Sequence, residues 1–220
     1  TLGGWGVTTI RPKDRDALLQ ALRAGVVPRT GQHLIQVGRA REIEALIHDI
    51  ERVADGGTAF RLVIGEYGSG KTFFLNLIRS IALEKKLVAT TADLNPDRRL
   101  HATGGQARSL YAELSRNLST RTKPDGGAIV GIVEKFIFSA TTSAKTEGVD
   151  TDLVIHRQLA RLSELVNGYD FAHVIECYWR GHCEGSDQLK TDSIRWLRGE
   201  FTTKTDARNS LGVRTIIDDA

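Results

Sequence analysis

One short segment holds the residues best suited to chemistry. Gly65-Glu66-Tyr67-Gly68-Ser69-Gly70-Lys71-Thr72 fits the phosphate-loop pattern G-x-x-x-x-G-K-[ST] at every fixed position. Glycines let such a loop turn with its backbone N–H groups pointing inward, which makes a concave site for an anion. We expect Lys71 to act as the catalytic cation that reaches the β- and γ-phosphates of a nucleoside triphosphate, and the Thr72 hydroxyl to ligate Mg²⁺. The predicted nucleotide-binding residues of the loop are Gly65, Glu66, Tyr67, Gly68, Ser69, Gly70, Lys71 and Thr72, with Glu66 and Tyr67 at variable positions that have no individual role.

The segments on either side of this loop predict the elements that would position it. Residues 60–64 have the composition of a buried strand, residues 72–86 that of a helix, and residues 87–92 that of a second strand ending at Asp93. Two strands joined by a helix form a right-handed parallel β-α-β unit. The predicted fold class is therefore α/β, with a parallel sheet at the core of a P-loop nucleotide-binding domain. The alternative is a glycine-rich turn before a helix that starts with Lys-Thr, with no phosphate site.

Helical periodicity dominates the rest of the chain. Pro12 opens a short helical pattern, an apolar stripe runs from Ile43 to Val53, and further stripes follow from about Gln106 onward. The polar stretch 139–152 is predicted to be a mobile linker. We expect an N-terminal helical or extended segment over 1–32, the first part of the P-loop core over 33–105, and a mainly helical insertion or subdomain over 106–220.

Nucleotide hydrolysis would need a further carboxylate, at the end of a neighbouring apolar strand, to hold Mg²⁺. The nearest match is the segment 214–219, which ends in Asp218-Asp219, but Arg214 and Thr215 interrupt its apolar run and favour a capping or loop segment. Asp93 ends a predicted strand, but its spacing does not place it near magnesium. The chain has no methionine, even at position 1, so we expect a longer natural protein whose remaining strands and catalytic acid lie beyond Ala220.

Composition narrows the class of protein. Hydrophobic residues at 40% and charged residues at 26% are typical of globular domains. The net charge of +3 and the pI of about 8.9 allow an anionic partner such as nucleic acid without requiring one. No apolar stretch approaches the ~20 residues that cross a bilayer, and no secretory signal is visible, so we expect a cytoplasmic protein with no membrane partner.

The cysteines leave two interpretations open. Cys177 and Cys183 lie close in sequence to His173 and His182, which superficially offers a set of zinc ligands. The spacing matches no familiar zinc finger or ribbon, and ordinary helix packing is the simpler interpretation.

Two segments carry a resemblance to known families. Val37-Gly38-Arg39, one helix before the loop, resembles the opening segment of AAA+ ATPases of the replication-initiator and STAND branch, in which the Gly-Arg turn lies near the adenine. More narrowly, the segments 64–74, 92–100 and 199–201 resemble the ATP-binding proteins of BREX phage defence, the BrxC and BrxD group. The distinctive part is Ala92-Asp93-Leu94-Asn95-Pro96-Asp97-Arg98-Arg99-Leu100, and the likeness runs from about Gly31 to Ala220.

This resemblance implies an AAA+ core with a long helical insertion, ATP and Mg²⁺ as cofactors, and Val37, Gly38 and Arg39 near the base. It implies ATPase activity in the full-length protein, whereas the isolated chain lacks a clear acidic motif. It also implies DNA and other phage-defence proteins as partners, with homo-oligomers when the protein is complete.

The loop residues and the resemblance together are consistent with two functions. The first is an ATP-driven motor or switch in phage defence, for which a set of basic residues would contact DNA phosphates or simply be solvated. The second is a signalling or scaffold module in which nucleotide occupancy holds a conformation with little or no turnover. A small-molecule kinase fits less well, because no lid segment with paired arginines is visible. The basic residues in question are Arg98, Arg99, Arg116, Arg121 and Lys123.

Overall fold

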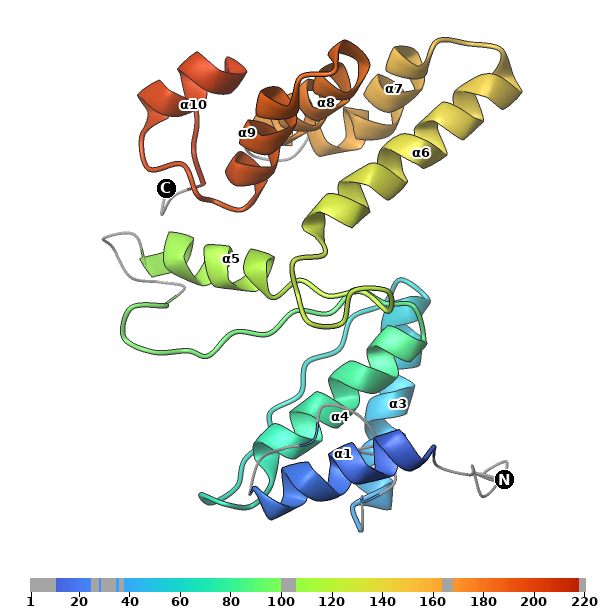
Figure 1. The fold of residues 1–220 in the computed structure, drawn as a ribbon, viewed down its shortest axis with the longest axis vertical. Coiled ribbons are helices and arrows are strands. Elements are labelled where there is room, and N and C mark those ends of the chain that lie inside the picture. The colour runs from blue at the N-terminus through green and yellow to red at the C-terminus, as the bar shows by residue number, and fades with distance from the viewer. Residues whose placement is uncertain are drawn as a thin grey trace. The chain divides into compact units, whose positions relative to one another are not determined.

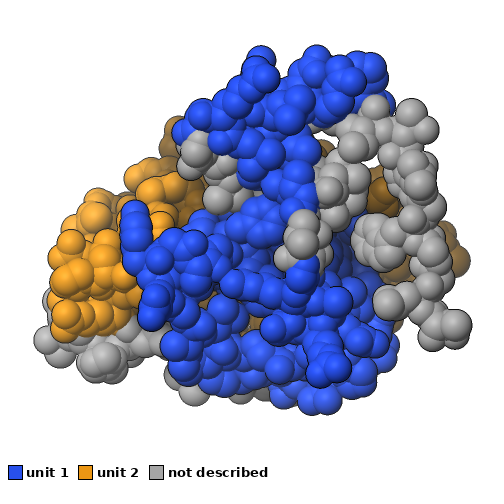
Figure 2. Space-filling model, turned by 90° about the horizontal axis from the view of Figure 1, so that it is seen from below, with its two compact units in different colours: residues 1–87 blue, residues 88–220 orange. Residues whose placement is uncertain are grey.

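The computed structural model describes residues 11–24, 28, 35, 38–99, 106–163 and 168–217. The chain divides into two compact units, residues 1–87 and residues 88–220, which are coloured separately in Figure 2. Throughout the described residues the regular structure is helical, and β-pairing is limited to isolated bridges. Each helix in these ranges is too short or too polar to span a bilayer.

The first unit is built around a pair of helices. It contains α1 (Pro12–Arg23), α3 (Ala40–Ala54) and α4 (Lys71–Glu84). Helices α3 and α4 pack side by side (Figure 1), and each buries apolar residues at the spacing that the sequence predicts. Ion pairs join α3 to two neighbouring segments, from Arg61 to Asp49 and from Lys85 to Glu51. The buried apolar residues of the pair are Leu46, Ile50, Phe74, Leu77 and Leu83.

The predicted α/β fold class, a parallel sheet in a P-loop core, is wrong for the described residues. Residues 60–64 form no strand, and Phe60, Leu62 and Ile64 are 90%, 71% and 85% exposed. The other predicted strand, 87–92, contributes a single antiparallel bridge between Ala89 and Ser119. A buried strand needs hydrogen-bonded neighbours along its length, because unpaired backbone N–H and C=O groups are costly to bury. The part of the chain that the structure describes supplies no such neighbour beside residues 60–64, so this apolar run is an irregular connection.

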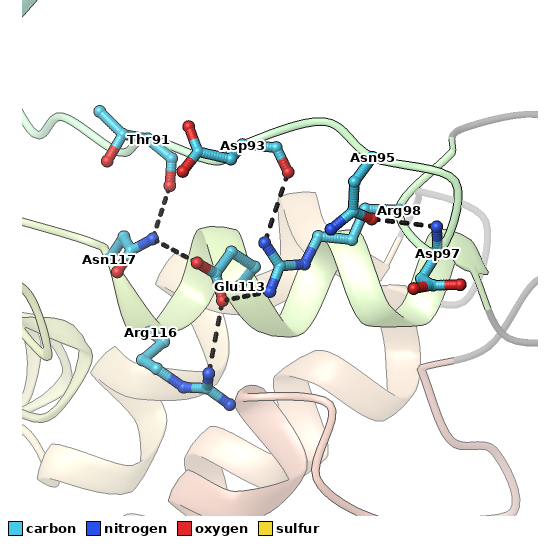
Figure 3. A network of polar contacts seen from close by, with 8 residues as sticks. All are labelled: Thr91, Asp93, Asn95, Asp97, Arg98, Glu113, Arg116 and Asn117. Carbon is cyan, nitrogen blue, oxygen red and sulfur yellow. Dashed lines mark hydrogen bonds and ion pairs between the residues drawn. The ribbon is translucent and has the colours of Figure 1, made fainter.

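The second unit begins with a loop that is fastened to a helix. Residues 91–98 lie along α5 (Gln106–Arg116) and are held by the polar network in Figure 3. Asn117 Nδ2 donates to the Thr91 carbonyl at 2.8 Å and to Glu113 Oε1 at 3.1 Å. Arg98 donates to the Asp93 carbonyl at 3.4 Å and forms an ion pair with Glu113, also at 3.4 Å. The distinctive sequence around residues 92–98 is therefore anchored through the side chains of Arg98 and Glu113.

The remaining helices of the second unit share one hydrophobic core. They are α6 (Ile129–Glu147), α7 (Thr151–Ser163), α8 (Gly168–Glu184), α9 (Asp187–Leu197) and α10 (Lys204–Leu211). Each helix packs against the one that follows it in the chain. Ser186 and Thr203 cap the N-termini of α9 and α10 by accepting from backbone N–H groups. The described residues after 106 are mainly helical, from α5 to α10. Cys177 lies in this core, whereas Cys183 is exposed.

The predicted mobile linker over 139–152 is also wrong, because residues up to Glu147 continue α6 and α7 starts at Thr151. Ala140 and Ala144 are one helical turn apart and are 0% and 2% exposed, so this stretch faces the core through small apolar side chains. The hydroxyls of Thr141 and Thr142 donate to the carbonyls one turn earlier, both at 2.9 Å. The polar composition of this stretch suggested a linker, but its threonine hydroxyls form hydrogen bonds to backbone carbonyls of the same helix.

Candidate nucleotide-binding site

The phosphate-loop segment turns directly into a helix, as predicted. Gly68 and Gly70 have φ values of 79° and 82°, a left-handed conformation that side chains disfavour. Gly70 is the N-cap of α4, and its carbonyl accepts from Phe74 N at 3.0 Å. Ser69 N donates to the Glu66 carbonyl at 3.2 Å, which closes the turn. The glycines therefore adopt the left-handed turns expected of the motif, although the described residues beside them form no sheet.

Lys71 curls over the loop from the first turn of α4. Its Nζ donates to the carbonyl oxygens of Gly65 at 2.7 Å and Glu66 at 2.6 Å. Both bonds are exposed to solvent, so they can be exchanged for other acceptors at modest cost. The arrangement holds a positive charge at the mouth of the loop, where the sequence places the phosphates.

Ser69 contributes a hydroxyl that is buried inside the loop. Its Oγ has no hydrogen-bond partner among the described residues. A Cβ added to Gly65 would lie 2.6 Å from this oxygen, closer than real contacts allow. A larger residue at Gly65 would therefore force the Ser69 hydroxyl to rotate away from its present position, in which it is a donor that an oxygen ligand could accept from.

Arg39 brings the predicted base-side segment into contact with the loop. Its Nη2 donates to the Ser69 carbonyl at 2.6 Å, and its guanidinium carbon lies 5.5 Å from the centroid of the Phe74 ring. Gly38 and Arg39 both have left-handed backbones, with φ values of 76° and 54°. Val37 lies outside the described residues.

A cleft of about 560 Å³ opens beside these groups, within the size range of small-ligand sites. Among the described residues, its lining includes the cationic side chains Arg39, Arg41, Arg61 and Lys71 and the carboxylate of Glu42; Arg61 also pairs with Asp49. Arg41, Arg61 and Phe74 line the cleft, although the sequence did not predict them there. The charge of Arg61 within an otherwise apolar run was the signal that this run is not a fully buried strand.

The remaining predicted residues are not among those that line the cleft. Thr72 is exposed at the second position of α4, and its hydroxyl is the hard oxygen ligand that Mg²⁺ prefers. Glu66, Tyr67 and Gly68 are exposed on the loop, and Tyr67 is fully so. The excess of cationic groups, together with the buried Ser69 hydroxyl that lacks a partner among the described atoms, fits a polyanion such as a triphosphate.

Comparison with known proteins gives one match. The family model described as "BREX system ATP-binding protein BrxC/D" matches residues 10–220, a span that includes the whole cleft and all of the second unit. No curated protein and no solved structure matches the chain.

Proposed function

This chain belongs to the BrxC/D family of BREX system ATP-binding proteins, and we propose that it binds Mg-ATP in the cleft beside Lys71 and serves as a nucleotide-driven motor or switch in phage defence. The observation that carries the proposal is the cleft itself. Among the described residues, Arg39, Arg41 and Lys71 line it together with Arg61, whose charge is paired with Asp49, and with the carboxylate of Glu42; they lie next to a loop of left-handed glycines at a helix N-terminus. Each of these features favours negative charge in the same place.

The residues of the loop would have different roles in binding Mg-ATP. Lys71 would exchange its bonds to the Gly65 and Glu66 carbonyls for bonds to phosphate oxygens, which are stronger because both partners are charged. Gly65, Gly68 and Gly70 would present backbone N–H groups and Ser69 its hydroxyl, while Thr72 would hold Mg²⁺ through its oxygen. Bound Mg-ATP supplies a phosphoryl group whose transfer releases free energy; in this proposal the described residues bind and orient it.

Calorimetric titration of Mg-ATP into the chain and its Lys71→Ala variant tests the proposal. We expect saturable binding that weakens at least tenfold in the variant, on the order of 1.4 kcal/mol. Lys85→Ala is a matched control, since Lys85 belongs to the same unit but pairs with Glu51 and does not line the cleft. Equal losses in both variants would point to a general charge effect, and no binding by the parent chain would reject the site.

DNA, other defence proteins and further copies of the chain are the proposed partners. Arg98 and Arg116 both engage Glu113, so they are poor choices for testing DNA contact. Arg121 and Lys123 are exposed on one tight turn, where the Lys123 and Thr120 backbones pair. Replacing both with Ala should reduce the salt dependence of DNA binding by the full-length protein if they contact phosphates.

Turnover separates the motor or switch from the second candidate, a scaffold in which nucleotide occupancy alone sets the conformation. A steady-state ATPase assay on the full-length protein, with DNA and partner proteins present, gives the answer. Negligible turnover under those conditions favours the scaffold.

A further inference from the structure

We propose that Arg39 is a positioning residue for the phosphate-binding loop: it clamps the Ser69 carbonyl and thereby fixes the orientation of the peptide group that carries the next backbone N–H, that of Gly70. This inference rests on the proposed function for its effect on affinity, but the clamp itself can be tested without nucleotide. It concerns a contact between residues thirty apart in sequence, made possible by the packing of α3 against α4.

The contacts of Arg39 converge on the loop and the helix that follows it. The Nη2 bond to the Ser69 carbonyl, at 2.6 Å, is a charge-assisted bond to a neutral acceptor. The guanidinium also lies over the ring of Phe74, a residue only 6% exposed in the first turn of α4. The ring limits the direction from which the guanidinium approaches the loop. The Arg39 side chain therefore contacts both the Ser69 carbonyl and the first turn of α4.

The geometry of the peptide group converts this clamp into an orientation. The peptide between Ser69 and Gly70 is trans, so its C=O and N–H point in opposite directions. Because the carbonyl is directed at Arg39, the Gly70 N–H is directed away from Arg39. Backbone N–H groups at such a turn are the donors that bind phosphate, and a rotated peptide would present a carbonyl in their place.

The backbone conformation of Arg39 is one that arginine disfavours, which indicates that the side chain has a role of its own. Arg39 adopts φ 54° and ψ 27° as the N-cap of α3, a left-handed conformation that glycine occupies without strain. It makes no side-chain capping bond to its own helix. Glycine would adopt this backbone conformation with less strain, whereas arginine supplies the guanidinium that contacts the loop.

Arg39→Gly is accordingly the informative variant, because it relieves the backbone and removes the clamp. We expect its thermal midpoint to be unchanged or raised, since glycine suits the left-handed N-cap. Without nucleotide, amide hydrogen exchange over residues 65–74 should become faster. Affinity for Mg-ATP should fall about fivefold, in line with the loss of one charged contact.

Two further variants separate positioning from charge. Arg41→Ala removes the same charge from the same cleft and leaves the Arg39 contacts in place, so exchange over residues 65–74 should stay at the parent rate. Arg39→Lys keeps the charge and one donor but loses the planar group over Phe74, so it should restore the slow exchange and the affinity only in part.

The outcomes distinguish the clamp from the nucleotide site. Faster exchange in Arg39→Gly, with a retained thermal midpoint and partial rescue by lysine, supports the clamp even if the parent chain fails to bind Mg-ATP, in which case the proposed function alone is rejected. Exchange at the parent rate in Arg39→Gly overturns the clamp, whatever the affinity. A lowered midpoint with uniformly faster exchange across the first unit also overturns it, because Arg39 would then be a general stabilising residue.

Discussion

Replacing Glu113 should release the loop over residues 91–98 from α5. Glu113 is the centre of the network in Figure 3, and its side chain is only 18% exposed. Arg98, which is 26% exposed, pairs with it at 3.4 Å, and Asn117 donates to it at 3.1 Å. Arg116 also contacts it at 3.3 Å, but that side chain is 72% exposed. The change Glu113→Ala removes all of these contacts at once.

The expected magnitude follows from the exposure of each partner. The Asn117 bond is worth about 1 kcal/mol, and the partly shielded Arg98 pair contributes a similar amount. The exposed Arg116 pair adds roughly 0.3 kcal/mol, because water screens it. The sum, about 2 kcal/mol, corresponds to local opening of the loop that is about thirty times more frequent. Glu113→Gln retains an acceptor and should cost about half as much.

Amide hydrogen exchange reports this local opening directly, whereas a single global unfolding curve is hard to interpret for a chain of two units. The informative amides are Asp97 N and Arg98 N, which are bonded to the Asn95 side chain and carbonyl at 2.9 and 3.0 Å. The matched control is Arg116→Gln, which should change their exchange less than about threefold. If Arg116→Gln accelerates exchange as much as Glu113→Ala, or if neither does, the assignment of Glu113 as the anchor is refuted.

Two further predictions concern the second unit. Ala140→Leu should destabilise it by about 1–3 kcal/mol, since Ala140 is 0% exposed in the core, whereas Ser139→Leu on the exposed side of α6 should cost under about 0.5 kcal/mol; amide hydrogen exchange in the second unit compares them. Burial raises the pKa of Tyr111 above its usual 10.0, and its hydroxyl donates to the Leu197 carbonyl at 2.8 Å. A tyrosine in the unfolded chain ionises first as the pH rises, so this stabilisation is present below about pH 10 and is lost above it. Tyr111→Phe should therefore reduce the loss of stability at alkaline pH. The part of that loss that is due to Tyr178, whose pKa burial also raises, should remain.

Helices and the loop could be predicted from sequence because their determinants are local. The apolar stripe that includes Leu46 and Ile50 identifies α3 by its spacing alone, and the start of α4 differs from the predicted position by one residue. Gly68 and Gly70 predict left-handed turns because few other residues adopt them. In the second unit the same periodicity located the helical region after residue 106.

The failures involve partners that are distant in sequence. An apolar run such as Phe60–Ile64 fits a buried strand only if neighbouring strands satisfy its backbone, and nothing in the run itself reports whether they are there. The helix over 139–147 was hidden because Ala140 and Ala144 are small and their neighbours are threonines and serines. The Arg39–Ser69 bond depends on how α3 and α4 pack, so the sequence could place Arg39 near the site only by resemblance.

The proposed anion site would be organised without a sheet among the described residues. Three features support the loop: glycines that accept left-handed φ values, the N-terminus of α4, and the contact from Arg39. The first two are properties of the loop and its own helix, but the third comes from the start of α3, which packs against α4 and buries Leu46 and Ile50, as α4 buries Phe74. Phe74 takes part in both the helix packing and the Arg39 contact, so packing between the helices and orientation of the loop are coupled through one ring. A change that shifts α3 along α4 should therefore alter the site even when every residue of the loop is intact.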